Sequence, residues 1–274
     1  MPPRFTLARS IDPDYPTNRA ILLLTLAVLA GGVIVTLLSG AAIPGSIIAA
    51  VSGAASFFLA WALGRELDPD EEYAAFVSAG LMAGALLLFP LPDPVTALFA
   101  VLLLRTVNRT SGLPTQVLDS VVLLLIAAWP LMQGYLLAGA AMAAALLLDG
   151  LLSRPNRLQP GFALLALLET GFFAASGPGI TVDPIVPAAG GALLLGSLLY
   201  LAVIGRSQSV TTTGDRTQKR LSPIRVQSAQ VLVLSWAFLS AVIGGETAFV
   251  AMLPIWAGIV GTGMYRVTVH LTSQ

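Results

Sequence analysis

The chain alternates long apolar runs with short breaks that contain Pro, Gly or charged residues. Pairs such as Pro44-Gly45 and Gly244-Gly245 are typical of turns. About 20 apolar residues let a helix cross the hydrocarbon core of a bilayer. The pattern therefore predicts ten transmembrane helices, at residues 20–38, 45–64, 71–89, 93–106, 115–130, 132–149, 161–177, 184–205, 227–244 and 247–266. Several of these predicted spans are short for that role.

The composition is that of a membrane protein. Hydrophobic residues make up 56% of the chain, charged residues 10%, and the mean hydropathy is +0.86, whereas roughly a quarter of the residues in a soluble domain are charged. The formal net charge is zero, so the chain has no basic surface for nucleic acid. It contains no Cys and a single His, His270, which excludes thiolate and multi-His metal sites. We therefore expect neither a metal nor a cofactor.

All fourteen Lys and Arg residues fall on one side of the predicted bundle. They lie in the N-terminal segment, in the connections after the second, fourth, sixth and eighth spans, and at the C-terminus. The opposite connections carry only Asp93, Asp183 and Glu246. Because positively charged loops stay in the cytoplasm, we predict a multi-pass protein of the plasma or inner membrane with both termini inside.

The predicted fold class is therefore an all-α, polytopic membrane helix bundle of five hairpins. Residues 1–19 form a cytoplasmic N-terminal segment and residues 20–205 an eight-helix bundle. Residues 206–226 form a basic cytoplasmic loop, rich in Ser and Thr, that we expect to be mobile. Residues 227–266 add a two-helix hairpin packed on the bundle, and residues 267–274 form a cytoplasmic tail.

Small residues on several predicted helices indicate close helix packing, because they let two backbones approach each other in lipid. Gly80 and Gly84 form a Gly-x-x-x-Gly pair in the third span, and Gly258 and Gly261 lie in the tenth. We expect such faces to pack inside the bundle rather than between two copies of the chain.

The pattern Arg-x-aliphatic-Asp-Pro-Asp occurs twice, each time before an apolar run. Asp at the N-cap, Pro at the first helical position and acidic residues in the first turn all favour a helix start. We interpret Asp12, Asp14, Asp68, Asp70 and Glu71 as helix-capping residues of a repeat. The alternative is that these acidic clusters, with the nearby Arg residues, hold a divalent ion or a phosphate.

Apart from acids in the first or last two positions of a span, two acidic residues lie within predicted spans. Glu169 is near the middle of 161–177, where an ionised carboxylate is costly unless it is paired or reached by water. We interpret Glu169 as a proton-coupling or substrate-binding residue, and the alternative is a protonated side chain bonded to nearby backbone. Asp119, about one turn into its span, is interpreted as a partner of Arg105 or Arg109.

Further candidate binding residues cluster at the predicted cytoplasmic rim. They are Arg65, Arg105, Asn108, Arg109, Asp149, Arg154, Asn156 and Arg157. Arg groups together with Asn and carboxylates suit a phosphate-bearing lipid or nucleotide. The alternative is that these residues only orient the helices and touch lipid headgroups without specificity.

Three classes of function fit this sequence. The first is a secondary transporter or permease for a small solute or lipid that uses Glu169. The second is a membrane-embedded enzyme acting on a phosphate-bearing lipid at the rim. The third is a structural subunit that has other membrane subunits, besides the lipid bilayer, as partners. We favour the transporter because no catalytic motif is present; Asp149 to Arg154 resembles only the opening of the CDP-alcohol phosphotransferase motif, whose metal-binding Asp residues are missing.

Overall fold

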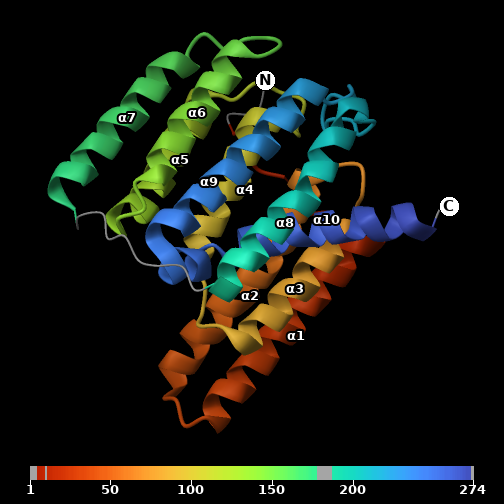
Figure 1. The fold of residues 1–274 in the computed structure, drawn as a ribbon, viewed down its shortest axis with the longest axis vertical. Coiled ribbons are helices and arrows are strands. Elements are labelled where there is room, and N and C mark those ends of the chain that lie inside the picture. The colour runs from red at the N-terminus through yellow and green to blue at the C-terminus, as the bar shows by residue number, and fades with distance from the viewer. Residues whose placement is uncertain (1–4, 10, 178–186, 273–274) are drawn as a thin grey trace.

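The computed structural model describes residues 5–9, 11–177 and 187–272 as a bundle of helices (Figure 1). Within these ranges the helices are α1 (Pro16–Leu38), α2 (Ile43–Leu67), α3 (Ala74–Leu88), α4 (Pro94–Asn108), α5 (Val117–Met132), α6 (Leu137–Leu151), α7 (Gln159–Ser176), α8 (Pro187–Arg206), α9 (Pro223–Ala251) and α10 (Leu253–Thr272). A short 3-10 turn, η1 (Ser207–Ser209), follows α8. In the described part of the chain, β pairing is limited to one isolated bridge between Thr213 and Arg220.

Four segments are long and apolar enough to cross a membrane, namely α1, α2, Gly190–Ser209 and α9. Helices α3, α4 and α6 have 15 residues each and α5 has 16. At about 1.5 Å per residue, these four rise roughly 22–24 Å, which is less than the roughly 30 Å of a bilayer core. Each predicted span overlaps one of the helices, and the predicted all-α fold class is confirmed. Asp183, between α7 and α8, lies outside the described residues.

Local sequence chemistry explains several helix boundaries. Asp93 caps α4, because its carboxylate accepts hydrogen bonds from the Val95 N–H (2.9 Å) and the Thr96 hydroxyl (2.5 Å). Gly245, with φ +57° and ψ −144°, breaks α9 at the predicted Gly244-Gly245 turn. The helix then resumes as far as Ala251, so α10 begins six residues later than the tenth predicted span.

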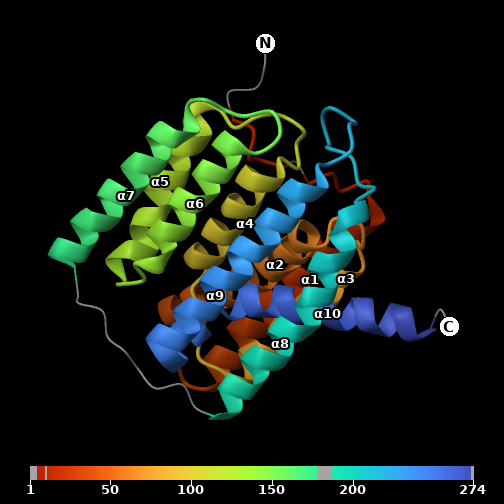
Figure 2. The same ribbon diagram turned by 45° about the horizontal axis from the view of Figure 1, so that its top comes forward.

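Helix backbones approach closely where α10 crosses α2 and α3. Figures 1 and 2 both show α10 lying crosswise to these helices. A Cβ added to Gly261 would meet the backbone of Ser78 in α3 at 2.6 Å, and one added to Gly258 would meet Leu67 of α2 at 2.9 Å. Small residues at these two positions are therefore what let the three backbones meet.

The last two helices pack on different neighbours. Helix α9 packs mainly on α4 and α6, whereas α10 packs on α2, α3 and α8. Helix α10 also continues to Thr272, so most of the predicted tail is helical. Gly80 and Gly84 of α3 have nothing within 4 Å of a built Cβ, so their face does not pack inside the bundle.

The connections gather at two opposite ends of the bundle. At one end, which we call the basic end, the N-terminal segment meets the α2–α3, α4–α5, α6–α7 and α8–α9 loops. The Thr6 N–H donates to Asp119 (2.7 Å), the Thr212 N–H donates to Asp70 (2.8 Å), and Arg225 Nε donates to the Ser153 carbonyl (3.1 Å). At the other end the α3–α4 loop meets the end of α9, where the Asp93 N–H donates to the Ala251 carbonyl.

The packing predicts opposite effects for two Gly to Ala substitutions. Gly261→Ala forces a Cβ against the Ser78 backbone and should lower the free energy of unfolding by about 1–3 kcal/mol. Gly80→Ala adds a methyl group to an open face of a helix and should leave the stability unchanged or raise it by about 0.5–1 kcal/mol. Unfolding of both variants in mild detergent measures the difference, and an equal loss in both would contradict the crossing.

Candidate functional site

The centre of the basic end is a buried carboxylate shared by two guanidinium groups. Asp149, in the last turn of α6, is fully buried. Its Oδ1 accepts from Arg109 Nε at 2.6 Å and from Arg225 Nη1 at 2.9 Å. Its Oδ2 accepts a hydrogen bond from the Thr115 hydroxyl group. The Arg109 and Arg225 side chains are 8% and 3% exposed, so the ionic contacts are shielded from water.

Backbone carbonyls hold the two guanidinium groups in place. Arg225, in the first turn of α9, donates to the carbonyls of Val107 at the end of α4 and Ser153 after α6. Arg109 Nη1 donates to the Arg154 carbonyl at 2.9 Å. The ends of α4, α6 and α9 are therefore joined through Asp149 and its two arginines.

A second set of side chains ties the start of α7 to the α4–α5 loop. Asn156 Nδ2 donates to the Thr115 carbonyl at 2.8 Å, and Gln159 Nε2 donates to the Thr115 hydroxyl oxygen at 2.8 Å and to Ser120. The side-chain amides of Asn156 and Gln159 thus hold Thr115 in place next to Asp149. Both oxygens of the buried Asp149 carboxylate therefore accept hydrogen bonds from side chains of the protein.

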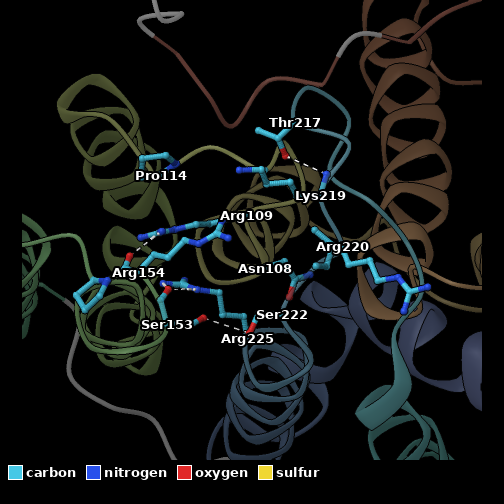
Figure 3. Close-up of a pocket in the computed structure, with 13 residues that line it drawn as sticks. Asn108, Arg109, Pro114, Ser153, Arg154, Thr217, Lys219, Arg220, Ser222 and Arg225 are labelled. Atoms are coloured by element: carbon cyan, nitrogen blue, oxygen red, sulfur yellow. Dashed lines mark hydrogen bonds between the residues drawn. The ribbon is translucent and has the colours of Figure 1, made fainter.

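Next to this centre lies a pocket of about 590 Å³, which we call the rim pocket (Figure 3). The α4–α5, α6–α7 and α8–α9 loops form its walls. The charged residues that line it are Arg109, Arg154, Lys219, Arg220 and Arg225. No acidic residue is among the described residues that line it. In Figure 3, Arg154 and Lys219 come from opposite walls of the pocket.

Two of the pocket arginines adopt a strained backbone conformation. Within the described ranges, the non-Gly residues with positive φ are Arg109 (φ 54°), Arg154 (φ 58°) and Gln218 (φ 53°). Such conformations cost free energy and often accompany functional sites. Arg109 is also the C-cap of α4, and both arginines line the rim pocket.

The rim pocket carries more positive charge than the protein balances locally. Two buried guanidinium groups share the single charge of Asp149, and the side chains of Arg154, Lys219 and Arg220 are exposed. A buried cation without a counter-charge is unfavourable. The guanidinium group of Arg and the ammonium group of Lys also form strong hydrogen bonds to phosphate oxygens. The pocket is therefore chemically suited to a phosphate-bearing group.

The structure brings together part of the predicted rim set. Asn108, Arg109 and Arg154 line the rim pocket, with Asp149 and Asn156 beside it in the buried network. These five residues therefore lie together at the basic end.

Three other members of the rim set lie elsewhere. Arg65 pairs with Glu72 at 3.1 Å, and Arg105 pairs with buried Glu66 at 2.9 Å. Arg157 is exposed and does not line the rim pocket. The two pairs lie beside α2, where acidic residues of α2 and of the loop after it supply the local counter-charge.

The interpretation of Asp119 as a partner of Arg105 or Arg109 is wrong. Its carboxylate accepts from the backbone N–H groups of Thr6 (2.7 Å), Leu7 (3.2 Å) and Gln116 (2.6 Å). Both Asp119 and Thr6 are buried. Asp119 therefore anchors the N-terminal segment to the start of α5.

The helix-capping interpretation of the second Asp-Pro-Asp motif is also wrong. Asp68 is the C-cap of α2, and α3 begins at Ala74 after Tyr73. The carboxylates of Asp68 and Glu71 instead accept from Arg266 of α10, at 2.6 and 2.8 Å. Burial raises the pKa of Asp68 above its ordinary value, although the hydrogen bond from Arg266 acts in the opposite direction.

Asp70, the second acid of this motif, holds the α8–α9 loop. Its carboxylate accepts from the N–H groups of Thr211 and Thr212 and from the Thr212 hydroxyl, at 2.6–3.1 Å. Burial by itself acts to raise the pKa of Asp70. The hydrogen bonds together outweigh burial, so the pKa of Asp70 lies below its ordinary value. The loop, expected to be mobile, is therefore held by specific contacts.

The first motif also does not cap its helix. Helix α1 begins at Pro16, its N-cap is Tyr15, and the Asp12 carboxylate accepts from the Asp14 N–H at 3.0 Å. Asp12 and Asp14 thus form a local turn that ends one residue before Tyr15, the N-cap of α1. Within the described part of the chain, no group of three His, Cys, Asp or Glu residues is arranged to hold a metal ion.

Glu169 lies in α7, at the edge of the bundle, where α7 packs on α5 and α6 (Figure 1). Its side chain is partly buried, and Oε2 has no hydrogen-bond partner. Glu169 lines none of the pockets at the basic end.

Several site residues were missed from the sequence, above all Arg225 and Lys219, which were assigned to the mobile loop. Arg225 had one usable signal. A cation in the first turn of a helix is unfavourable with respect to the helix dipole, so its position two residues after Pro223 indicates a tertiary partner.

No known protein family, curated protein or solved structure matches the chain.

The shared carboxylate predicts a large loss of stability for Asp149→Asn. The substitution keeps the shape of the side chain but leaves two buried guanidinium groups without a counter-charge, which should cost about 3–5 kcal/mol. Asp215→Asn removes an exposed partner of Arg9 and is the control, with an expected cost of no more than about 1 kcal/mol. Thermal unfolding in detergent compares them, and equal midpoints would refute the assigned role of Asp149.

Proposed function

We propose that this chain is a multi-pass membrane protein that binds a phosphate-bearing lipid headgroup in its rim pocket. The observation that carries the proposal is the lining of this pocket, which has five cationic and no acidic side chains among its described residues. Positive patches at the level of the headgroups attract anionic lipids. A phosphate in the pocket would also balance the surplus charge beside Asp149.

The proposed topology has ten crossings with both termini in the cytoplasm. It is supported by the contacts that gather the basic loops at one end, since positive charge marks the cytoplasmic side. Arg266 of α10 reaches the α2–α3 loop through Asp68, which supports a last helix that returns to the same end. The shorter helices α3–α6 would then require a locally thinner bilayer or neighbouring helices that shield their ends.

Binding fits the rim pocket better than catalysis does. General acid–base chemistry needs an ionisable group that can reach the substrate. The nearest carboxylate, Asp149, already accepts hydrogen bonds from Arg109, Arg225 and Thr115. The exposed pocket residues Arg154, Lys219 and Arg220 supply charge and hydrogen-bond donors.

Neutralising the rim pocket should weaken phosphate binding. Arg154→Gln combined with Lys219→Gln removes two exposed cations without touching the buried pair, and should lower the affinity for dihexanoyl phosphatidic acid at least about tenfold. Calorimetry on the detergent-purified protein measures the affinity. Inorganic phosphate is titrated in parallel, and the lipid should bind more tightly.

The control is Arg157→Gln combined with Arg206→Gln, which removes two exposed cations that do not line the pocket. This variant should retain the affinity of the wild type. An equal loss in both double variants would show nonspecific surface attraction and would overturn the proposed site. Equal affinities for lipid and inorganic phosphate would exclude a lipid as the preferred ligand.

A second candidate function is proton-coupled transport of a small solute or lipid, with Glu169 as the coupling carboxylate. It is supported by the buried Oε2 of Glu169, which has no hydrogen-bond partner. An acidic residue within a membrane-spanning segment is rarely retained without a partner or a role.

Replacing this carboxylate tests the transport function. Glu169→Gln removes the titratable proton and should abolish proton flux into proteoliposomes across an imposed pH gradient, read with an internal pH-sensitive dye. Glu246→Gln, an exposed acid near the kink in α9, should leave the flux intact. Transport through Glu169 is refuted if the wild type and Glu169→Gln show the same flux.

A further inference from the structure

One wall of the rim pocket is a loop segment with almost no apolar anchorage. Val210 and Leu221, at the two ends of this segment, are buried with Val226 in a small apolar cluster separate from the main core. Residues 211–220, between them, contain no Val, Ile, Leu, Met or aromatic residue. We call residues 211–220 the strap. A segment with few buried apolar contacts opens locally at a low cost in free energy.

Internal backbone contacts let the strap move as one unit. The Gly214 N–H donates to the Lys219 carbonyl at 2.8 Å, and an isolated β bridge joins Thr213 to Arg220. The two buried residues at its ends form a fixed base. The strap can therefore swing on this base without losing its own shape.

Polar contacts and one close fit hold the strap against the rest of the basic end. At its start, Asp70 accepts from two of its backbone N–H groups, at 2.8 and 3.1 Å. Further along, the Asp215 N–H donates to a carbonyl of the α4–α5 loop at 3.1 Å, and the Asp215 carboxylate forms an exposed ion pair with Arg9 at 2.8 Å. A Cβ added to Gly214 would meet the backbone of Gly112 at 2.8 Å, so the strap fits closely against the α4–α5 loop.

Electrostatic repulsion opposes this closed position. The strap carries three cations, Arg216, Lys219 and Arg220, and one acid, Asp215. In Figure 3, Lys219 lies across the rim pocket from Arg154, and no acidic residue is among the described residues that line the pocket. Like charges that face each other are unfavourable. A phosphate group between Lys219 and Arg154 would replace their repulsion by two attractive contacts.

We propose that the strap opens from and closes over the rim pocket, and that the phosphate-bearing ligand holds it closed. A ligand shifts such an equilibrium only if it binds one state more tightly than the other. Here the difference is Lys219, which contacts the ligand only when the strap is closed. Asp70 is a positioning residue, because it touches the strap and does not line the rim pocket. This inference rests on the proposed function and adds the regulation of the same site.

Limited trypsin digestion of the full chain in detergent measures the closing of the strap. The readout is cleavage after Arg216, located by mass spectrometry, because Arg216 does not line the rim pocket and its N–H is bonded to the Ser111 carbonyl at 3.2 Å. The protease cleaves there when the strap opens. A saturating concentration of dihexanoyl phosphatidic acid should slow this cleavage at least about fivefold. Cleavage after Arg157, an exposed residue outside the pocket, should keep its rate, which controls for inhibition of the protease.

Asp70→Ala tests the anchor of the strap. Without ligand it should speed cleavage after Arg216 at least about tenfold, and it should lower the affinity for dihexanoyl phosphatidic acid about fivefold, because the ligand must then close a strap that is mostly open. Loss of a negative charge would by itself strengthen phosphate binding, so weaker binding has to come from the strap. Glu72→Ala is the matched control, since Glu72 lies in the same α2–α3 loop and pairs with Arg65. It should change neither measurement, and an unchanged rate of cleavage after Arg157 shows that each variant is folded.

Three results would overturn the strap and leave the rim-pocket site intact. They are binding of the lipid to the wild type without slower cleavage after Arg216, cleavage of Asp70→Ala at the rate of the wild type, and faster cleavage of Asp70→Ala with the affinity of the wild type. A wild type that binds no phosphatidic acid overturns the proposed function, and the strap with it. Arg9→Gln, which releases the strap at its other contact, should shift both measurements in the direction of Asp70→Ala by a smaller factor, because the ion pair is exposed.

Discussion

The basic end depends on one buried carboxylate that two guanidinium groups share. Asp149 lies where α4, α6 and α9 end or begin, and it bonds to Arg109 from the end of the first of these helices and Arg225 from the start of the last. A single charge facing two in a buried site is stable only when other donors and acceptors are satisfied. The carbonyls of Val107, Ser153 and Arg154 meet this requirement for the arginines.

This constraint explains why the loops of the basic end are ordered together. The α8–α9 loop is held at one side by Asp70 and leads at the other into Arg225. The N-terminal segment is held by Asp119. Cations from three loops are thereby gathered around the rim pocket.

The positions of the helices and the grouping of the charged loops could be predicted from the sequence, because apolar runs, Pro and Gly breaks and the bias of Arg residues are local signals. The partners of the acids could not. Asp68 and Asp70 occur in a pattern that favours a helix start, yet their partners are Arg266 and the backbone N–H groups of the distant α8–α9 loop. Asp119 was assigned to an arginine, yet it binds backbone N–H groups of the N-terminal segment. The packing of Gly80 and Gly84 in the third predicted span could not be predicted either. Their Gly-x-x-x-Gly spacing does not indicate which face of the helix turns toward the bundle.

Part of the rim pocket could also be predicted. Asn108, Arg109 and Arg154 lie in adjacent predicted loops, so their convergence follows from the topology. Lys219 and Arg225 come from a segment more than 60 residues further along the chain, and only the packing of α9 on α4 and α6 brings them near.

The most direct test of the central claim is an experimental structure of the protein purified with its native lipids. The account predicts phosphate density in the rim pocket within about 3.2 Å of the Arg154 and Lys219 side-chain nitrogens, with Asp149 between Arg109 and Arg225. A rim pocket filled by apolar density, or an Asp149 separated from both arginines, would contradict it.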